Sequence, residues 1–318
     1  MTRPIAVLLL AIAIAFPLSL LAGRVWIDPF HPAILNAGVI LIELRLPRAL
    51  LALIVGAGLG TAGAAMQGYL RNPLADPGLF GIAPGAALGA VLSLWTGMSA
   101  GWLLPLFALI GAGGAMALLA LIAGRDGGVP LFTLAGMMIA SLAGALMSLV
   151  ISLAPTPFAM SEIVTWLMGA LSDRSWRDVA IAAPLTAAGL AVLALTGRGL
   201  DALTLGEAAA RSLGMEPRRL QALMIAGIGL TVGASVAVAG IIGFVGLMVP
   251  HFVRPFTDRR PSSLLLPSAL AGALLLLLAD VLCRVLPMVS ELRLGIALSL
   301  LGAPFFLALL LRMRKGLV

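Results

Sequence analysis

Residues 47–64 read PRALLALIVGAGLGTAGA, and residues 217–234 read PRRLQALMIAGIGLTVGA. Aligned end to end, the two stretches are identical at eight positions: Pro, Arg, Leu, Ala, Leu, Thr, Gly and Ala. This similarity indicates an internal repeat within one domain (residues 1–318), with halves at about 47–198 and 217–318. Five predicted membrane spans run from the start of one copy to the start of the other. An odd number inverts the second copy, an arrangement found in many transporters.

The composition around the repeat is that of a membrane protein. Of 318 residues, 61% are hydrophobic and 10% are charged, whereas soluble domains have about 45–50% and about 25%. The apolar residues form long blocks, so the chain is expected to lie in a lipid bilayer. The excess of 20 Lys and Arg over 13 Asp and Glu is expected to hold loops on the cytoplasmic side rather than to bind nucleic acid.

Counts of rare residues exclude several functions. Lys315 is the single lysine and no Ser or Thr follows it, so the G-x-x-x-x-G-K-[ST] phosphate-binding loop is absent. His31, His251 and Cys283 are too few for a typical zinc site without carboxylates, and one cysteine allows no intrachain disulfide. We therefore expect the chain to bind no metal or cofactor of its own. If ATP and magnesium are used, another chain must hold them.

The apolar blocks predict ten membrane-spanning helices, because about 20 apolar residues are needed to cross the hydrocarbon. In the uncharged region 220–253, glycines and Pro250 favour a full span followed by a short one, with one long tilted helix as the alternative. The spans are 4–22, 48–69, 79–97, 102–124, 130–153, 178–196, 220–238, 241–253, 263–283 and 294–311.

Ten spans place both termini on one side, and the cations indicate which side. With the N-terminus inside, thirteen Arg and Lys residues fall in internal segments and seven in external ones, which favours cytoplasmic termini. Residues 1–23 could pass for a signal peptide, but nine further spans favour a retained first helix. The internal cations are Arg3, Arg71, Arg125, Arg198, Arg211, Arg218, Arg219, Arg254, Arg259, Arg260, Arg312, Arg314 and Lys315; the external ones are Arg24, Arg45, Arg48, Arg174, Arg177, Arg284 and Arg293.

Small residues at four-residue spacing predict close contact between helices in a bundle. The alternative is that these glycines mark flexible or broken helices. The positions are Gly56 and Gly60; Gly81, Gly85 and Gly89; and Gly229 and Gly233.

The most distinctive stretch, QGYLRNPLADPG at 67–78, is by its residues a tight loop on the inside, because Asn-Pro and Asp-Pro-Gly form turns. Together with RLPR (45–48), GFVGLMVPHFVR (243–254), LLLADVLCR (276–284) and LGAPFFLALLL (301–311), this stretch resembles the permease family of bacterial importers for vitamin B12, haem and ferric siderophores. The resemblance runs from about residue 40 to the C-terminus.

The resemblance implies an all-α, BtuC-like protein of ten helices in the bacterial inner membrane. Such permeases pair with a second permease copy, with two cytoplasmic ATP-binding subunits and with a periplasmic substrate-binding protein. Substrate passes along the dimer axis, and ATP with its magnesium belongs to the ATPase subunits.

Carried over residue by residue, the resemblance assigns Arg45, Arg48 and Arg284 to docking of acidic residues on the binding protein. Guanidinium groups suit that role because their planar fork matches a carboxylate. Snorkelling of interfacial arginines is the alternative for Arg45 and Arg48. One departure from the family is Arg293 in Glu291-Leu292-Arg293, where relatives have Glu-Leu-Pro. Whether Arg293 joins the docking set or meets an anionic substrate stays open.

The segment at about 200–216 matches the family's cytoplasmic coupling element, which transmits ATPase movement to the bundle. An acid early in a short helix suits the helix dipole, and a glycine can end the helix. The alternative is a solvated loop helix carrying one Glu207–Arg211 ion pair. The residues assigned to coupling are Leu205, Gly206, Glu207, Arg211, Leu213 and Gly214.

The fifth span carries a stripe of small and polar residues that faces either another helix or a water-filled path. The family places this helix beside the translocation pathway, and residues 160–169 resemble its short gate helix at the outer mouth. The stripe consists of Met137, Ser141, Gly144, Ser148 and Ser152.

Two titratable residues have open roles. Asp280 precedes Arg284 by one helical turn, so it either pairs with and orients Arg284 or couples transport to protons. His251 follows Pro250 and is interpreted as a structural residue at a helix end rather than a ligand.

The function expected from these features is the permease subunit of an ATP-driven importer for an iron chelate, haem or a ferric siderophore. A vitamin B12 permease of the same family is the alternative. From other classes, an ion-coupled secondary transporter would need more buried carboxylates, and an intramembrane protease would need a serine or metal site that the sequence lacks.

Overall fold

The computed structural model describes residues 2–28, 37–124, 128–288 and 290–315; Arg125 and His31 lie outside these residues. The described chain is all-helical, as predicted. Its elements are α1 (Thr2–Leu21), α2 (Ala37–Val39), η1 (Ile40–Arg45), α3 (Leu46–Leu70), η2 (Pro77–Phe80), α4 (Ile82–Trp95), α5 (Leu103–Ala123), α6 (Gly128–Ser152), α7 (Pro157–Leu167), α8 (Trp176–Leu195), α9 (Gly197–Leu203), α10 (Glu207–Ser212), α11 (Pro217–Ala239), α12 (Val245–Val253), η3 (Arg254–Phe256), α13 (Pro261–Val285) and α14 (Leu294–Lys315).

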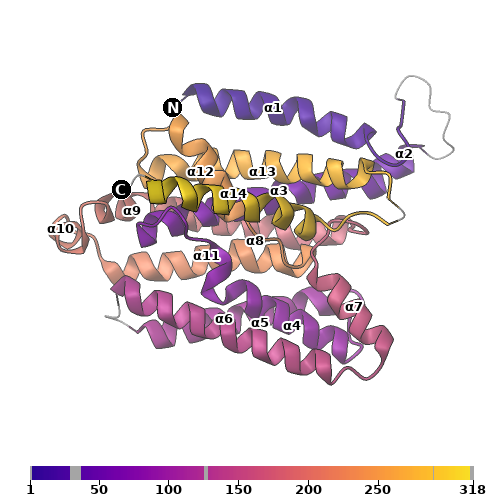
Figure 1. Cartoon of the computed structure of the whole chain (residues 1–318), viewed down its shortest axis with the longest axis horizontal. Helices are drawn as coiled ribbons and strands as arrows, with labels where there is room; N and C mark the ends of the chain where they lie inside the picture. Colours follow the sequence, from indigo (N-terminus) through magenta and orange to yellow (C-terminus); the bar gives the residue numbers. More distant parts are fainter. Residues whose placement is uncertain (1, 29–36, 125–127, 289, 316–318) are drawn as a thin grey trace.

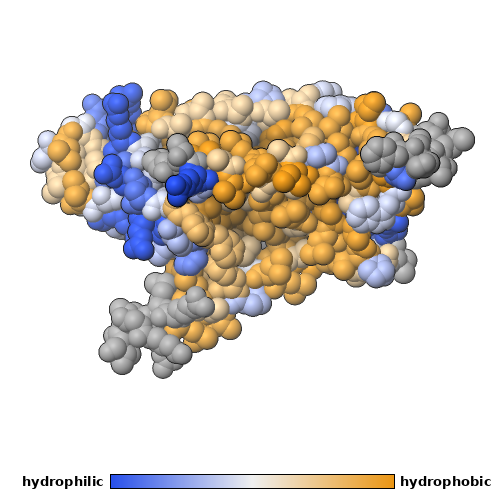
Figure 2. Space-filling model, turned by 90° about the horizontal axis from the view of Figure 1, so that it is seen from above, coloured by the Kyte–Doolittle hydropathy of each residue, from blue (hydrophilic) through white to orange (hydrophobic). Residues whose placement is uncertain are grey.

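The long helices lie roughly side by side, and the two termini lie at the same end of the bundle, together with α9 and α10 (Figure 1). Within the described residues, eight helical segments are long and apolar enough to cross a membrane. A broad hydrophobic band covers the middle of the molecule, and hydrophilic residues gather at its ends (Figure 2). This is the surface expected of a bundle whose flanks face lipid.

The ten predicted spans each correspond to a helix, but two of these helices are short. α4 has 14 residues and α12 has 9, which makes them about 21 and about 14 Å long at 1.5 Å per residue. The break expected in 220–253 lies between Ala239 and Val245. Gly240 ends α11 with a positive φ of 71°, a conformation that costs glycine little.

Each short helix follows one of the two repeated helices, and each begins in the same way. The residue before α4 is Gly81, with φ 77°, and the residue before α12 is Phe244, with φ 66°. α3 and α11 are thus both followed by irregular backbone, a left-handed residue and a short helix. The division into halves at about 47–198 and 217–318 stays a prediction.

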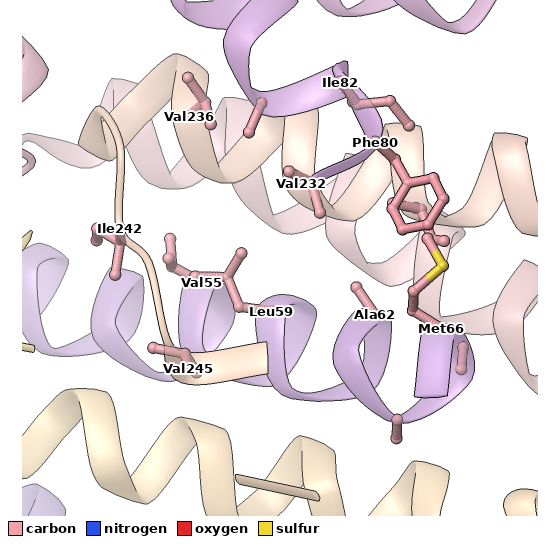
Figure 3. Packing of buried hydrophobic residues seen from close by; sticks show 14 of the residues in the cluster. Val55, Leu59, Ala62, Met66, Phe80, Ile82, Val232, Val236, Ile242 and Val245 are labelled. Atoms are coloured by element: carbon pink, nitrogen blue, oxygen red, sulfur yellow. The ribbon is translucent and has the colours of Figure 1, made fainter. Parts of the chain in front are cut away.

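The segment after α3 corrects one expectation. Its turn-forming residues predict a loop confined to the inside, yet Asp76, Pro77 and Gly78 share a cavity with Leu59, halfway along α3, and with Gly240 beyond α11. Phe80 lies beside Met66 of α3 (Figure 3), and both Phe80 and Ile82 belong to the buried core. The segment therefore re-enters the bundle. Irregular backbone is tolerated at that depth because protein rather than lipid surrounds it.

Glycine contacts bring helix backbones together, as the spacing predicts. A methyl group added to Gly56 of α3 would overlap the carbonyl of Gly272 of α13, and one added to Gly60 would overlap the carbonyl of Ser268. Gly89 approaches Phe107 of α5 in the same way. Gly81 differs, because it ends the irregular segment before α4 rather than lying within a helix.

Candidate functional site

Four charged side chains meet at the end of the bundle opposite the termini. Nε of Arg48 on α3 donates to both carboxylate oxygens of Asp280 on α13, at 3.0 and 3.1 Å, and its Nη2 lies 2.9 Å from Oδ1. The same Nη2 lies 2.8 Å from Oε2 of Glu291. Nε of Arg284 lies 3.2 Å from Oδ2 of Asp280, and its Nη2 donates to the carbonyl of Ser19 on α1. We call Arg48, Asp280, Arg284 and Glu291 the charge cluster.

The charge cluster is largely buried, with Glu291 as its most exposed member at 29%, and its two cations balance its two anions. Asp280 is 0% and Arg284 is 4% exposed, and the Arg48 side chain is 13% exposed. Charges at such depth are tolerated only when they are paired. The local Asp280–Arg284 pair expected from the four-residue spacing is present, and Arg48 adds a second cation to the same carboxylate.

Arg45 lies beside the charge cluster with a different set of partners. Its Nη1 donates to the carbonyls of Leu20 and Leu21, both at 2.8 Å, and its Nη2 donates to the carbonyl of Val25 at 2.6 Å. The carbonyls of Leu20 and Leu21 are among those that the end of α1 leaves without helical partners, so Arg45 caps that helix, and its bond to Val25 holds the segment that follows.

The three arginines assigned to docking therefore share one end of the bundle. Each of the three arginines donates hydrogen bonds to acceptors within the chain, so none of them is an isolated surface cation. Docking of a binding protein by Arg45, Arg48 and Arg284 stays a prediction.

At the end with the termini, α9 and α10 form the segment assigned to coupling. Gly206 and Gly214, with φ of 96° and 84°, bound α10 on either side. Ala210 is fully buried, whereas Leu205 and Leu213 are 65% and 67% exposed. Two large apolar side chains thus project away from the bundle, where another protein surface could cover them.

The ion pair that would make α10 an ordinary solvated helix is absent from the described structure. Glu207 and Arg211 instead line a cavity of about 490 Å³ between α10 and the start of α11, which Tyr69 of α3 also lines. Coupling by Leu205, Gly206, Glu207, Arg211, Leu213 and Gly214 stays a prediction.

The stripe on α6 is uncovered in the single chain. Met137 is 52% exposed, and Ser141, Ser148 and Ser152 are also exposed, while Gly144 is half-buried with open space beside its Cα. The opposite side of α6, with Phe132 and Ile139, packs into the bundle. The stripe is free to line a path or to meet a second chain, and lining of the pathway stays a prediction.

α7 covers most of the segment that resembles a gate helix. The hydroxyl of Thr156 accepts a hydrogen bond from the amide of Ala159 and so caps the first turn of α7. Beside it lies a cavity of about 320 Å³, lined by Trp166, Arg174 and Arg293 among others. Nη1 of Arg293 donates to Ser172 at 3.2 Å. Arg293 thus lines this cavity beside α7 and takes no part in the contacts of the charge cluster.

Asp280 and His251, the two titratable residues whose roles the sequence leaves open, are not part of a metal site in the described structure. Among the described residues, no three His, Cys, Asp or Glu side chains gather as metal ligands would. The ring of His251 packs edge-on against Phe305 of α14, with centroids 5.4 Å apart, which agrees with its structural interpretation.

The chain is similar to known transport proteins in sequence and in fold. Residues 9–312 match the model of the FecCD transport family. The chain belongs to the FecCD transport family. It is 39% identical over 308 residues to the vitamin B12 import system permease protein BtuC of Salmonella paratyphi A, covering 95% of this chain and 93% of that protein.

Two further relatives extend the assignment. The chain is 39% identical over 284 residues to the uncharacterized ABC transporter permease protein YvrB of Bacillus subtilis (strain 168), covering 87% of this chain and 80% of YvrB. A solved metal-chelate type ABC transporter in an inward-facing conformation superposes with a TM-score of 0.91 at 31% identity, covering 98% of this chain and all of that one. This FecCD-family chain is therefore an importer permease of the ABC class.

Proposed function

We propose that this FecCD-family chain works as one of two identical permease subunits, with two cytoplasmic ATP-binding subunits and a periplasmic substrate-binding protein. ATP and magnesium are bound by the ATPase subunits, so the permease itself catalyses no reaction. The observation that carries this proposal is the exposed pair Leu205 and Leu213 beside the buried Ala210. They form a projecting apolar surface on a segment anchored in the bundle, which is what a mechanical contact to a motor subunit requires.

The proposed orientation places both termini and α10 in the cytoplasm of a bacterium, with the chain in the inner membrane. Two observations support it. The termini and α10 lie at one end of the bundle (Figure 1), and the cations expected inside outnumber those expected outside by thirteen to seven.

The substrate we propose is a large metal chelate. An iron chelate, haem or a ferric siderophore, is the sequence-based expectation, and the 39% identity to BtuC over 308 residues favours vitamin B12 as the second candidate. The stripe on α6 offers hydroxyl, thioether and apolar groups and no strong metal ligand. A path of this kind passes a chelate without stripping its metal, because chelate and path form no coordinate bond.

At the outer end, we propose that Arg45 contributes to docking of the binding protein, with Arg48 and Arg284 supporting that surface from the charge cluster. Arg45→Gln should weaken association with the binding protein by a few-fold, measured by calorimetric titration. Arg177→Gln, at an exposed position on the same side, is the matched control. Equal affinities for all three proteins would contradict the docking role.

The experiment that tests the function is uptake by the reconstituted complex. Purified permease, ATPase and binding protein are placed in vesicles, and entry of haem, a ferric siderophore and cobalamin is compared with and without ATP. We expect uptake of one chelate that needs all three proteins and ATP. Uptake by the permease alone, or uptake driven by an ion gradient without ATP, would overturn the proposal.

A further inference from the structure

Three arginines converge on a hollow at the end of the bundle that carries the termini. The cavity measures about 210 Å³ and is lined by Arg71 after α3, Arg254 in η3 and Arg259 before α13. Gln67 and Asn72 also line it, and no Asp or Glu is among the residues that form its wall. We call it the arginine pocket.

Three carboxylates close in sequence to the arginine pocket are engaged elsewhere, and the first of them, Asp76, accepts from the amide of Gly78 at 2.7 Å. Asp201 accepts from the amide of Ser262 at 2.9 Å and from its hydroxyl at 2.6 Å. Asp258 accepts from the hydroxyl of Ser263 and from the amide of Arg260. The positive charge of the arginine pocket is thus not neutralised by the part of the chain that the structure describes.

The pocket also holds donors without acceptors. Nη2 of Arg254 donates to Oε1 of Gln67 at 2.7 Å, but the Nε atom of Arg254 is buried and has no acceptor among the described residues. Arg71 and Arg259 are exposed, and their guanidinium groups make no hydrogen bond or ion pair with any described residue. Burial, together with the neighbouring Arg259, lowers the pKa of Arg254. An unpaired buried donor beside like charges is costly, and an anion in the pocket would remove that cost.

We propose that the arginine pocket binds a phosphate group, and that its source in the cell is an anionic phospholipid headgroup or free phosphate. A phosphate offers several oxygens to converging guanidinium forks, and each fork can bind two of them. The pocket volume of about 210 Å³ is several times the roughly 30 Å³ of a water molecule in the liquid, so a phosphate group fits.

Position favours the lipid source. The pocket lies where α3 ends and α13 begins, at the rim of the two apolar helices that are long enough to cross a membrane. With the proposed orientation, this rim faces the cytoplasmic leaflet, whose anionic headgroups are attracted to clustered arginines beside membrane helices. A bound headgroup would hold the ends of α3 and α13 and the turn at Arg254 in one arrangement.

The test compares two variants of the full chain that carry the same change in charge. R71Q/R259Q removes the two unpaired cations of the pocket, and R198Q/R219Q removes two exposed cations from another cavity at the same end. The proteins are purified in micelles that contain phosphatidylglycerol and phosphatidylcholine, and retained lipid is measured by native mass spectrometry. Calorimetric titration with inorganic phosphate follows.

Unaltered protein should retain one phosphatidylglycerol in preference to phosphatidylcholine. R71Q/R259Q should bind it at least about tenfold more weakly, because a hydrogen bond to a charged group is worth about that factor, and R198Q/R219Q, which does not contact the headgroup, should be unchanged. Displacement of the lipid by inorganic phosphate would support the site with free phosphate as a second source. This competition uses unaltered protein, so it holds even if a variant fails to fold.

Two outcomes would overturn the proposal. One is equal retention of phosphatidylglycerol by the unaltered protein and R71Q/R259Q. The other is binding of neither probe by the unaltered protein together with loss of ATPase association in R71Q/R259Q. That second result would assign the pocket to a carboxylate of the partner protein instead. Uptake measured with the same variants separates these outcomes from failure of the importer function itself.

Discussion

Replacing Asp280 by Asn tests whether the charge cluster holds together the end of the bundle opposite the termini. The carboxylate of Asp280 is fully buried and faces two guanidinium groups, those of Arg48 and Arg284. The substitution keeps the shape and one acceptor oxygen but removes the negative charge. The charge cluster, neutral before the substitution, then carries a net charge of about +1, since only Glu291 is left to balance the two arginines.

The magnitude follows from burial. Removing one partner of a buried ion pair costs about 3–5 kcal/mol because an uncompensated charge stays in a medium of low dielectric constant. Both arginines are largely buried, with side chains 13% and 4% exposed, so water cannot screen them. We expect Asp280→Asn to lower the unfolding free energy by an amount in this range. Adding Arg284→Met to Asp280→Asn should recover part of the loss, because the second change restores the neutrality of the cluster.

The measurement is the free energy of unfolding in detergent micelles, followed by circular dichroism. The control is Asp173→Asn, the same chemical change at an exposed residue of the same end, for which we expect a change within about 0.5 kcal/mol. Equal stabilities of the Asp280→Asn protein and the control, or a double variant less stable than Asp280→Asn, would refute the reasoning.

Three further predictions follow from the contacts. Gly56→Ala should lower the unfolding free energy by at least about 1–3 kcal/mol, because its methyl group would overlap the carbonyl of Gly272. Gly113→Ala, where the added methyl group meets open space, should leave the unfolding free energy unchanged or raise it by about 0.5–1 kcal/mol. If thermal unfolding showed the Gly113→Ala protein to be the less stable of the two, the packing argument would be contradicted. Leu205→Ser with Leu213→Ser should lower ATPase association at least tenfold in pull-down titrations while lipid retention stays normal; unchanged association would remove these residues from the coupling surface. Cys283 is 2% exposed, so a water-soluble maleimide should modify it at least a hundredfold more slowly in the folded protein than after unfolding. The rate of modification is followed by mass spectrometry, and equal rates in the two states would contradict the burial of Cys283.

Features that depend on local sequence could be predicted. Apolar blocks located the spans, and Gly240 located the break after α11, because helix length and glycine effects act over a few residues. The Asp280–Arg284 pair was visible because residues four apart share one face of a helix.

Features that depend on depth or distance could not be predicted. Asp76-Pro77-Gly78 forms turns both at a surface and inside a bundle, so its residues do not reveal that it re-enters the protein. The contacts of Arg48 with Asp280 and of Arg254 with Gln67 join residues 232 and 187 positions apart. Such pairs follow from how helices pack, and one sequence carries no local signal for them.

The contact between α3 and α13 limits which parts of the molecule are able to move. At Gly56 and Gly272 the two backbones meet with no side chain between them, so a sliding step of one residue would drive a carbonyl into a neighbouring Cα. This close backbone contact favours movement of the two helices together as one block. The opening and closing of a path then falls to elements outside that block, and labels that report motion are best attached to α6 and α7, with a pair on α3 and α13 as the fixed reference.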